Sequence, residues 1–283
     1  MTLLCLGCVI AVGASAYGML VTDISSDLRV PSGKPASPAR QEGEWASALR
    51  EARRECTLPA LDTVVQRLQQ HVAHAAADRT AWKNLAEALL ERVQQRAHLR
   101  GLTVGEPVWP ELPGENALDV DQGLAAVARA RELGDDSGAL FRIEAGLMSQ
   151  RITGLSSALQ WNTKVTAAID EATERGQDDP QLHVLMGMRV LMAPKLLGHD
   201  PERALEHFEF AAGALADDER PAVYAAMASY LQRKRQQAVS WLEQAVARNP
   251  KNSFARVVLQ RVRRDEGDPF GRDVSLAEAA ATK

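Results

Sequence analysis

Histidines and neighbouring acidic residues are the first places to look for chemistry in this chain. His71 and His74 are three residues apart on a predicted helix, a spacing that can place two imidazoles on one metal ion. No third ligand follows nearby in the sequence, so we expect a solvated helix face. His199 and Asp200 could form a catalytic pair, but Asp200 precedes Pro201 and suits the N-cap of a helix. These residues therefore predict neither a catalytic site nor a metal site.

Cysteines and loop motifs give the same answer. Cys5 and Cys8 lie in an apolar N-terminus and Cys56 stands alone, so neither a disulfide framework nor a zinc spacing is present. The Asp pairs lack the alternating spacing of a calcium loop, and the sequence contains no Gly-rich phosphate loop and no Gly-x-Ser-x-Gly. We predict a protein that is not an enzyme and that needs no cofactor.

The composition favours an all-α fold. The 283 residues are 46% hydrophobic but only 5% aromatic, and the net charge is −4. Ala and Leu dominate, while the alternating β-branched residues typical of strands are scarce. Both charge signs are spread along the chain, so a basic footprint for nucleic acid is missing and we expect no nucleic-acid partner.

The N-terminus predicts a membrane segment. Residues 3–21 carry no charge, and nineteen residues of helix span roughly 28 Å, close to the ~30 Å core of a bilayer. An uncleaved anchor is one reading. A signal peptide cleaved after Ala14-Ser15-Ala16, or a lipoprotein modified at Cys8, are the alternatives. Residues 1–21 would form this segment, and the Pro- and Ser-rich residues 22–41 would form a disordered tether.

The side of the membrane stays open at the level of sequence. Arg29, Lys34 and Arg40 follow the apolar segment and no basic residue precedes it, which by the positive-inside rule places the body in the cytoplasm. A short apolar segment ahead of a soluble helical domain is nevertheless the usual layout for export. We therefore expect a bacterial-type inner-membrane anchor with a periplasmic domain, or export to the periplasm.

An acidic turn recurs down the rest of the chain. Asp135-Asp136, Asp178-Asp179 and Asp217-Asp218 each close one apolar helical stretch, with Asp78 and Asn249-Pro250 as further members. Their spacing shrinks from 57 residues between Asp78 and Asp135 to 32 residues between Asp217 and Asn249. The last value is close to the ~34 residues of one standard solenoid repeat, so we expect stacked helical hairpins.

The residues before the last turn resemble a tetratricopeptide repeat (TPR). Ala238, Leu242, Ala245 and Pro250 occupy the small, large, small and proline positions of its second helix. Weaker copies precede it, and the resemblance covers about residues 79–264. Residues 42–56 and 58–76 look like a further, atypical pair. The resemblance implies an all-α, right-handed solenoid of TPR-like antiparallel helix pairs over residues 42–267, preceded by the apolar N-terminal helix and followed by a tail, residues 268–283.

A second resemblance is narrower. Residues 193–204 are similar to a Pro, Gly-Gly-Asp, Ala pattern of divergent exported TPR proteins, among them the T component of TRAP transporters, although His199 replaces the second Gly. That family implies a periplasmic accessory subunit with a ligand-sized apolar channel. We keep this as the alternative function, a transport accessory that binds a small apolar ligand.

The departures from the repeat point to a binding face. By pattern, the extra residues fall between the two helices of a pair, at about residues 101–118, 151–162 and 194–200. Insertions at equivalent places project from one edge of a solenoid, which is often its binding face. The main prediction is a membrane-anchored or periplasmic scaffold that binds protein partners through its groove or this edge, with candidate binding residues Trp109, Trp161, Leu196, Leu197 and His199.

Overall fold

Twelve α-helices make up the described part of the protein, and no strand occurs there. The computed structural model describes residues 43–99, 114–195 and 198–282. The helices are α2 (Glu44–Glu55), α3 (Leu58–His74), α4 (Arg79–Leu99), α5 (Gly114–Glu132), α6 (Gly138–Ser149), α7 (Leu155–Gly176), α8 (Pro180–Met192), α9 (Pro201–Ala214), α10 (Arg220–Leu231), α11 (Arg235–Arg248), α12 (Ser253–Arg263) and α13 (Leu276–Ala281).

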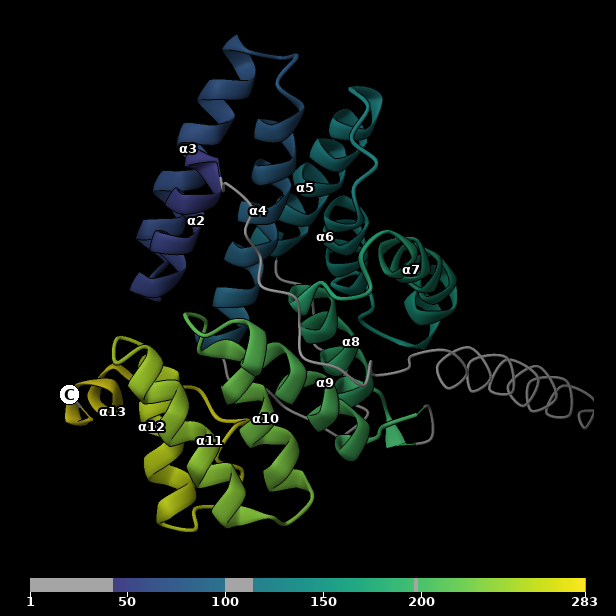
Figure 1. Cartoon of the computed structure of the whole chain (residues 1–283). Coiled ribbons are helices and arrows are strands. Elements are labelled where there is room, and N and C mark those ends of the chain that lie inside the picture. The colour runs from purple at the N-terminus through teal and green to yellow at the C-terminus, as the bar shows by residue number, and fades with distance from the viewer. Residues whose placement is uncertain (1–42, 100–113, 196–197, 283) are drawn as a thin grey trace, which may run out of the picture.

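The helices pack as consecutive antiparallel pairs, which confirms the predicted fold class. The closest contacts are those of α4 with α5, α6 with α7, α8 with α9 and α10 with α11. First helices also touch the first helices of neighbouring pairs, as α4 and α6 do, so the pairs stack into a solenoid. Figure 1 shows α2–α7, in purple to teal, stacked against α8–α13, in green to yellow.

The N-terminal predictions, an apolar segment over residues 1–21 and a tether over residues 22–41, lie outside the described residues. Within residues 43–99, 114–195 and 198–282, no helix has the length and apolar character needed to cross a membrane. The predicted tail, residues 268–283, contains α13, and Phe270 in the same segment is buried in the hydrophobic core.

The recurring acidic turn has a common local geometry. Its Asx side chain accepts a hydrogen bond from the backbone N–H two residues on: Asp135 from Ser137, Asp179 from Gln181, and Asn249 from Lys251. Short polar side chains favour this turn because they replace the hydrogen bonds that the first backbone N–H groups of a helix lack. The turn therefore ends one pair and begins the next.

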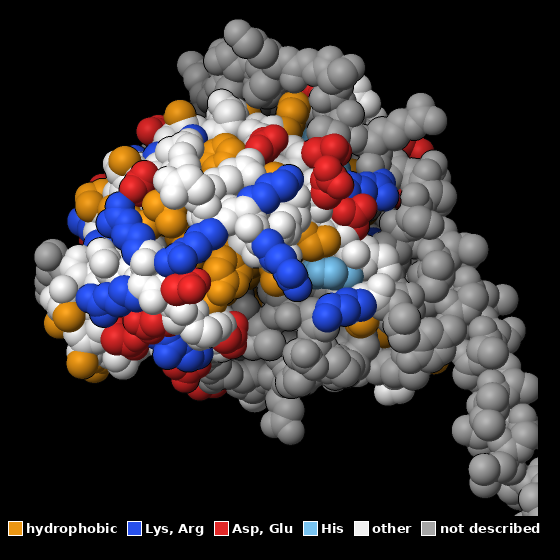
Figure 2. Space-filling view, turned by 90° about the horizontal axis from the view of Figure 1, so that it is seen from below, with side chains coloured by type: hydrophobic (Ala, Val, Ile, Leu, Met, Phe, Trp, Pro, Cys, Tyr) orange, Lys and Arg blue, Asp and Glu red, His pale blue; other side chains and the backbone are white. Residues whose placement is uncertain are grey.

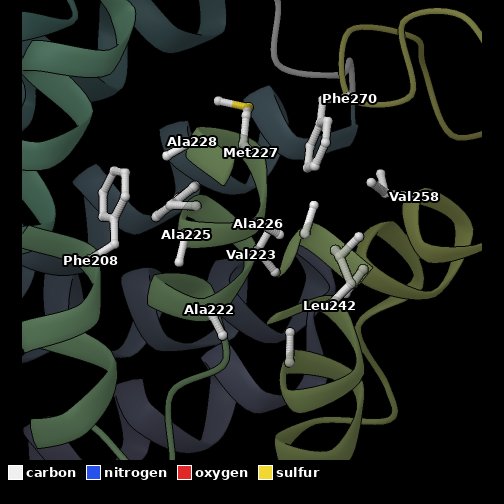
Figure 3. Close-up of a cluster of buried hydrophobic side chains, with 14 of the residues drawn as sticks. Phe208, Ala222, Val223, Ala225, Ala226, Met227, Ala228, Leu242, Val258 and Phe270 are labelled. Atoms are coloured by element: carbon white, nitrogen blue, oxygen red, sulfur yellow. The ribbon is translucent and has the colours of Figure 1, made fainter. Parts of the chain in front are cut away.

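Small residues bring the paired helices close together. A Cβ on Gly187 of α8 would lie 2.6 Å from Cε1 of Phe208 on α9, so only glycine fits at this crossing. Phe208 is fully buried, as are Ala204 and Ala211 on its own helix. The cluster around them, drawn in Figure 3, continues through α10 to Leu242 of α11. These are the positions at which the repeat pattern predicted small and large residues.

Two of the predicted insertions are shorter than the pattern indicated. α7 begins at Leu155, so Trp161 lies on a helix rather than in a loop inserted at residues 151–162. α5 begins at Gly114, inside the first predicted insertion. The repeat consensus fixes only a few positions. The pattern therefore cannot tell whether extra residues lengthen the second helix or the loop before it.

Candidate interaction site

Exposed large apolar side chains gather at one edge of the solenoid. We call this the insertion edge: the edge where the first helix of each pair ends and the second begins. Leu118 and Leu159 lie near the starts of α5 and α7, while Met192 and Leu231 are the last residues of α8 and α10. Of the large hydrophobic residues that are exposed in the described chain, Leu276 on α13 alone lies elsewhere. The predicted edge therefore coincides with the exposed apolar surface.

Trp161 lies at this edge but is only half exposed. Its ring packs against the small apolar cluster between α6, α7 and α8, which contains Met148 and Ile169. The Lys164 ammonium lies 4.9 Å from the ring centroid, within the range of a cation–π contact. One part of the Trp161 ring thus packs α7 against α6 and α8, and the remaining part of the ring is exposed to solvent.

His199 is the other candidate residue that the structure describes. Its Nδ1–H donates to the carbonyl oxygen of Leu191 at 2.7 Å, which satisfies one of the free carbonyls at the end of α8. The neighbouring Asp200 caps α9 by accepting from the N–H groups of Glu202 and Arg203. The two residues thus have separate helix-capping roles. The candidates Trp109, Leu196 and Leu197 lie outside the described residues.

A network of charged side chains lies between the two halves of the molecule, and sequence reasoning missed it. We call it the charged interior; its members are Arg53, Glu87, Glu91, Arg142, Asp179, Asp218 and Arg220. A single charged residue leaves no periodic pattern in the sequence. Glu91 and Arg220, which form one of the ion pairs, are 129 positions apart. The Asp members belong to the acidic turns, so these turns bind arginines as well as cap helices.

Two ion pairs of the charged interior cross from one half to the other. Arg220 Nη1 lies 2.7 Å from Glu91, and Arg142 Nε lies 3.2 Å from Asp179. Within the first half, Arg53 also lies 2.7 Å from Glu91. Because arginine has five donors in a planar fork, one guanidinium can hold two carboxylates at once.

The pKa values of this network follow from its ion pairs. Burial alone would raise the pKa of Glu87, but Arg142 and Arg53 outweigh it and lower that pKa to about 2. In the same way, burial acts against the charge of Asp218, and Arg220 outweighs it, so the pKa of Asp218 falls well below its usual range. Glu87 and Asp218 are therefore charged at neutral pH.

The end of α2 completes a ring by touching turns far along the chain. We call this the closing contact: the turn Arg53–Thr57 against residues 217–220 and 249–252. Asn249 Nδ2 donates to the carbonyl oxygen of Arg54 at 3.1 Å, and Lys251 lies 2.6 Å from Glu55. The solenoid thus bends until the end of α2 meets the fourth and fifth of the acidic turns, at Asp217-Asp218 and Asn249-Pro250.

Cys56 lies at the centre of the closing contact. Its Sγ is 3.4 Å from Glu219 Oε1 and accepts from Asn249 Nδ2 at 3.3 Å. Burial, with the nearby Glu219 carboxylate, raises the pKa of the Cys56 thiol far above its usual range. The thiol therefore stays protonated, which does not suit a nucleophile.

The remaining histidines have structural partners. His71 Nε2–H donates to Asp78 at 2.9 Å, whereas His74 bonds the carbonyl of Gln70, so the two rings do not converge. No group of three His, Cys, Asp or Glu side chains within the described ranges is placed to hold a metal ion. His207 of α9 is fully buried against α8. The polarity of a histidine did not reveal that its ring fills a core position.

His183 and His207 form a buried pair. His183 Nε2–H donates to the carbonyl of Gln177, so its Nδ1 accepts from His207 Nδ1–H at 3.0 Å. The outer Nε2 of His207 is buried without a partner. Burial lowers the pKa of both rings, that of His207 to about 3. The arrangement holds one proton between the two Nδ1 atoms and is stable only when both rings are neutral.

A hollow at the C-terminal end of the described chain has a mostly polar lining. A hollow of about 240 Å³ lies between α12 and α13, and its lining is mostly charged or polar, with Arg261, Arg264, Glu266 and Glu278 among its side chains. Arg261 is itself buried and binds the backbone carbonyls of the tail rather than a ligand. On the face in Figure 2, basic and acidic side chains are interspersed, without an extended basic stripe.

Comparisons with known proteins add little to this geometry. No protein-family model matches the chain, and no curated protein matches it. Among solved structures, it is similar to "YrrB: a TPR protein with an unusual peptide-binding site", with 13% sequence identity over 75% of this chain and 96% of that one and a TM-score of 0.35. A likeness of that size carries no argument, so the fold assignment rests on the helix packing described above.

Proposed function

We propose that this chain is a protein-interaction scaffold that binds a partner through its insertion edge. The observation that carries the proposal is the position of the exposed apolar side chains: Leu118, Leu159, Met192 and Leu231 all lie on that edge. Stacked helix pairs offer a long, rigid surface, and a few apolar anchors on such a surface supply most of the binding energy of an interface. The half-exposed ring of Trp161 would be one of these anchors.

The test compares the edge with an equally apolar site away from it. We expect the variant with Leu118→Ser, Leu159→Ser and Trp161→Ala to recover a co-purifying partner at least about tenfold less well than the parent chain. The control is Leu276→Ser, since Leu276 is 92% exposed but lies on α13. Equal recovery by the edge variant and the parent chain, with unchanged circular dichroism, would remove the insertion edge as the binding face.

The sequence-based choice of Trp109, Leu196, Leu197 and His199 extends the same proposal. Each of these residues falls in a predicted insertion at the edge. Single Trp109→Ala and paired Leu196→Ser with Leu197→Ser variants would show whether the segments that carry them contribute to binding. A partner recovered undiminished by both variants would restrict the site to the helix ends.

We also propose that residues 3–21 attach the scaffold to a membrane. The support is their uncharged, apolar composition and their length. The full chain should stay in the membrane pellet after alkaline carbonate washing, and a chain lacking residues 1–21 should be released. A full chain that is extracted by carbonate would contradict an anchor and favour a cleaved signal, which the mass of the mature N-terminus would reveal.

A further inference from the structure

The two halves of the molecule are joined by two contacts of different chemistry. Buried apolar residues form one cluster in α2–α6 and another in α8–α12 and Phe270, and these clusters have no residue in common. Among residues 43–99, 114–195 and 198–282, only the small cluster of α6, α7 and α8 connects them through apolar packing. On the other side, the halves meet through the charged interior and the closing contact, whose side-chain interactions are hydrogen bonds and ion pairs.

Such a polar contact costs little to open. Its outer pairs, Lys251 with Glu55 and Arg54 with Asp217, have side chains that are about half exposed or more, so salt screens them. Its inner pairs regain hydration when they separate, because the desolvation penalty of a buried ion pair offsets most of its Coulomb attraction. Neither half loses its own apolar core when the contact opens.

Asn249 donates the hydrogen bonds that join its turn to the end of α2. At this place in the repeat the earlier turns carry Asp, whereas Asn249 uses Oδ1 for the local turn and Nδ2 to hold Arg54 O and Cys56 Sγ. A carboxylate could make the turn but could not donate. The side chain is 3% exposed, so both its functions are buried in the closed ring.

We propose that the closing contact is a clasp: it opens reversibly while both halves stay folded, and in the closed ring it covers the inner faces of α4, α6 and α10. This goes beyond the proposed function, because the clasp controls a second surface, distinct from the insertion edge. In the open state the carboxylates Glu87, Glu91 and Glu219 would face solvent.

The reaction rate of the Cys56 thiol measures directly whether the clasp is open or closed. In a full-length chain with Cys5→Ser and Cys8→Ser, it is the only thiol that remains. We expect its rate of reaction with Ellman's reagent to rise at least about tenfold from 0.05 M to 1 M NaCl, with helix content unchanged. Glutathione, measured alongside, corrects for the effect of salt on the reagent. A corrected rate that is the same at both salt concentrations would overturn the clasp.

Substitutions separate opening from unfolding. Asn249→Asp keeps the turn and removes the donor, so it should raise the Cys56 rate about tenfold at low salt. Lys251→Glu and Glu55→Lys should each raise it a few-fold, and the two together should restore it, because the swap rebuilds the ion pair. Phe208→Ala weakens the apolar core of α8–α10 and removes no side chain of the closing contact. If it raises the Cys56 rate as much as Asn249→Asp does, the thiol is exposed by unfolding and the proposal fails.

Discussion

The helix pair α8–α9 and the closing contact both join elements of this solenoid, yet they do so by opposite means. At the first, Phe208 lies against Gly187 with no room for a methyl group between them. At the second, Asn249, Lys251 and the arginines of the charged interior meet polar atoms, and neither of the two large apolar clusters extends across the contact. One contact depends on shape and the other on charge.

The difference separates two properties of the molecule. Apolar packing inside the pairs determines whether a half folds, because it is the main source of free energy in the fold. The polar contacts determine how the halves sit against each other, and they respond to salt and to the loss of single charges. A substitution in the apolar packing should therefore change the stability of one half, whereas a substitution in the polar contacts should change the closure of the ring.

The largest effect should follow the loss of the Phe208 ring. Phe208→Ala leaves a cavity between α8, α9 and α10 and should lower the free energy of unfolding by about 3–5 kcal/mol. Phe141→Ala is the matched control, since Phe141 is half exposed and lies against Arg131 and Arg175. Urea denaturation measures both. Similar losses in the two variants would show that the pairs are not held by their buried core.

A smaller effect should follow the loss of one interior arginine. Arg220→Met leaves Asp218 buried without its paired arginine and leaves Glu91 with Arg53 alone, and it should cost about 3 kcal/mol. Arg263→Met removes an exposed partner of Glu243 and should cost less than about 0.5 kcal/mol. Thermal melts compare the two. If Arg220→Met were as mild as Arg263→Met, the charged interior would not be a structural network.

The smallest effect should come from acid acting on the histidine pair. The folded pKa values of His183 and His207 lie below the ordinary 6.5, so stability is present above pH 6.5 and is lost as the pH falls below it. Asp178 and Asp179 oppose this shift at His183, and Arg203 strengthens it at His207.

Between pH 7 and pH 5, His207 should contribute a loss of about 2 kcal/mol. His207→Asn keeps an N–H near the Nδ1 position but does not titrate, so its melting temperature should fall less over that range. The carboxylates with lowered pKa values, Glu87 among them, titrate below this window. An identical pH dependence in parent and variant would place the acid-sensitive group elsewhere.

The repeat pattern predicted the packing inside the pairs well. Ala238, Leu242 and Ala245 of the clearest repeat are all fully buried, and so is Phe208 of a weaker copy. Each of these positions is determined within one helix pair by the local periodicity of small and large residues, which is visible in sequence. The same local rule predicted the acidic turns as caps, and Asp179 and Asp200 act as N-caps.

The site was predicted less well. The pattern predicted the insertion edge because it gives the number and order of the helix ends. The position of Trp161 on α7 depends on the residue at which that helix starts, and a sequence pattern locates helix starts poorly. His207 and Arg261 have polar side chains, yet both are buried with partners that come from other segments.

By itself, the sequence determined the all-α class, the hairpin unit, the acidic turns and the edge where the pairs differ. These features follow from interactions between residues that lie within about forty positions of each other, and such interactions produce a periodic pattern in the sequence. Only the tertiary structure decided that the solenoid bends into a ring, that Arg53, Arg142 and Arg220 share carboxylates across it, and that Asn249 holds the end of α2. Those contacts join residues up to 195 positions apart. Their geometry is the sum of small rotations between successive pairs, which no local pattern encodes.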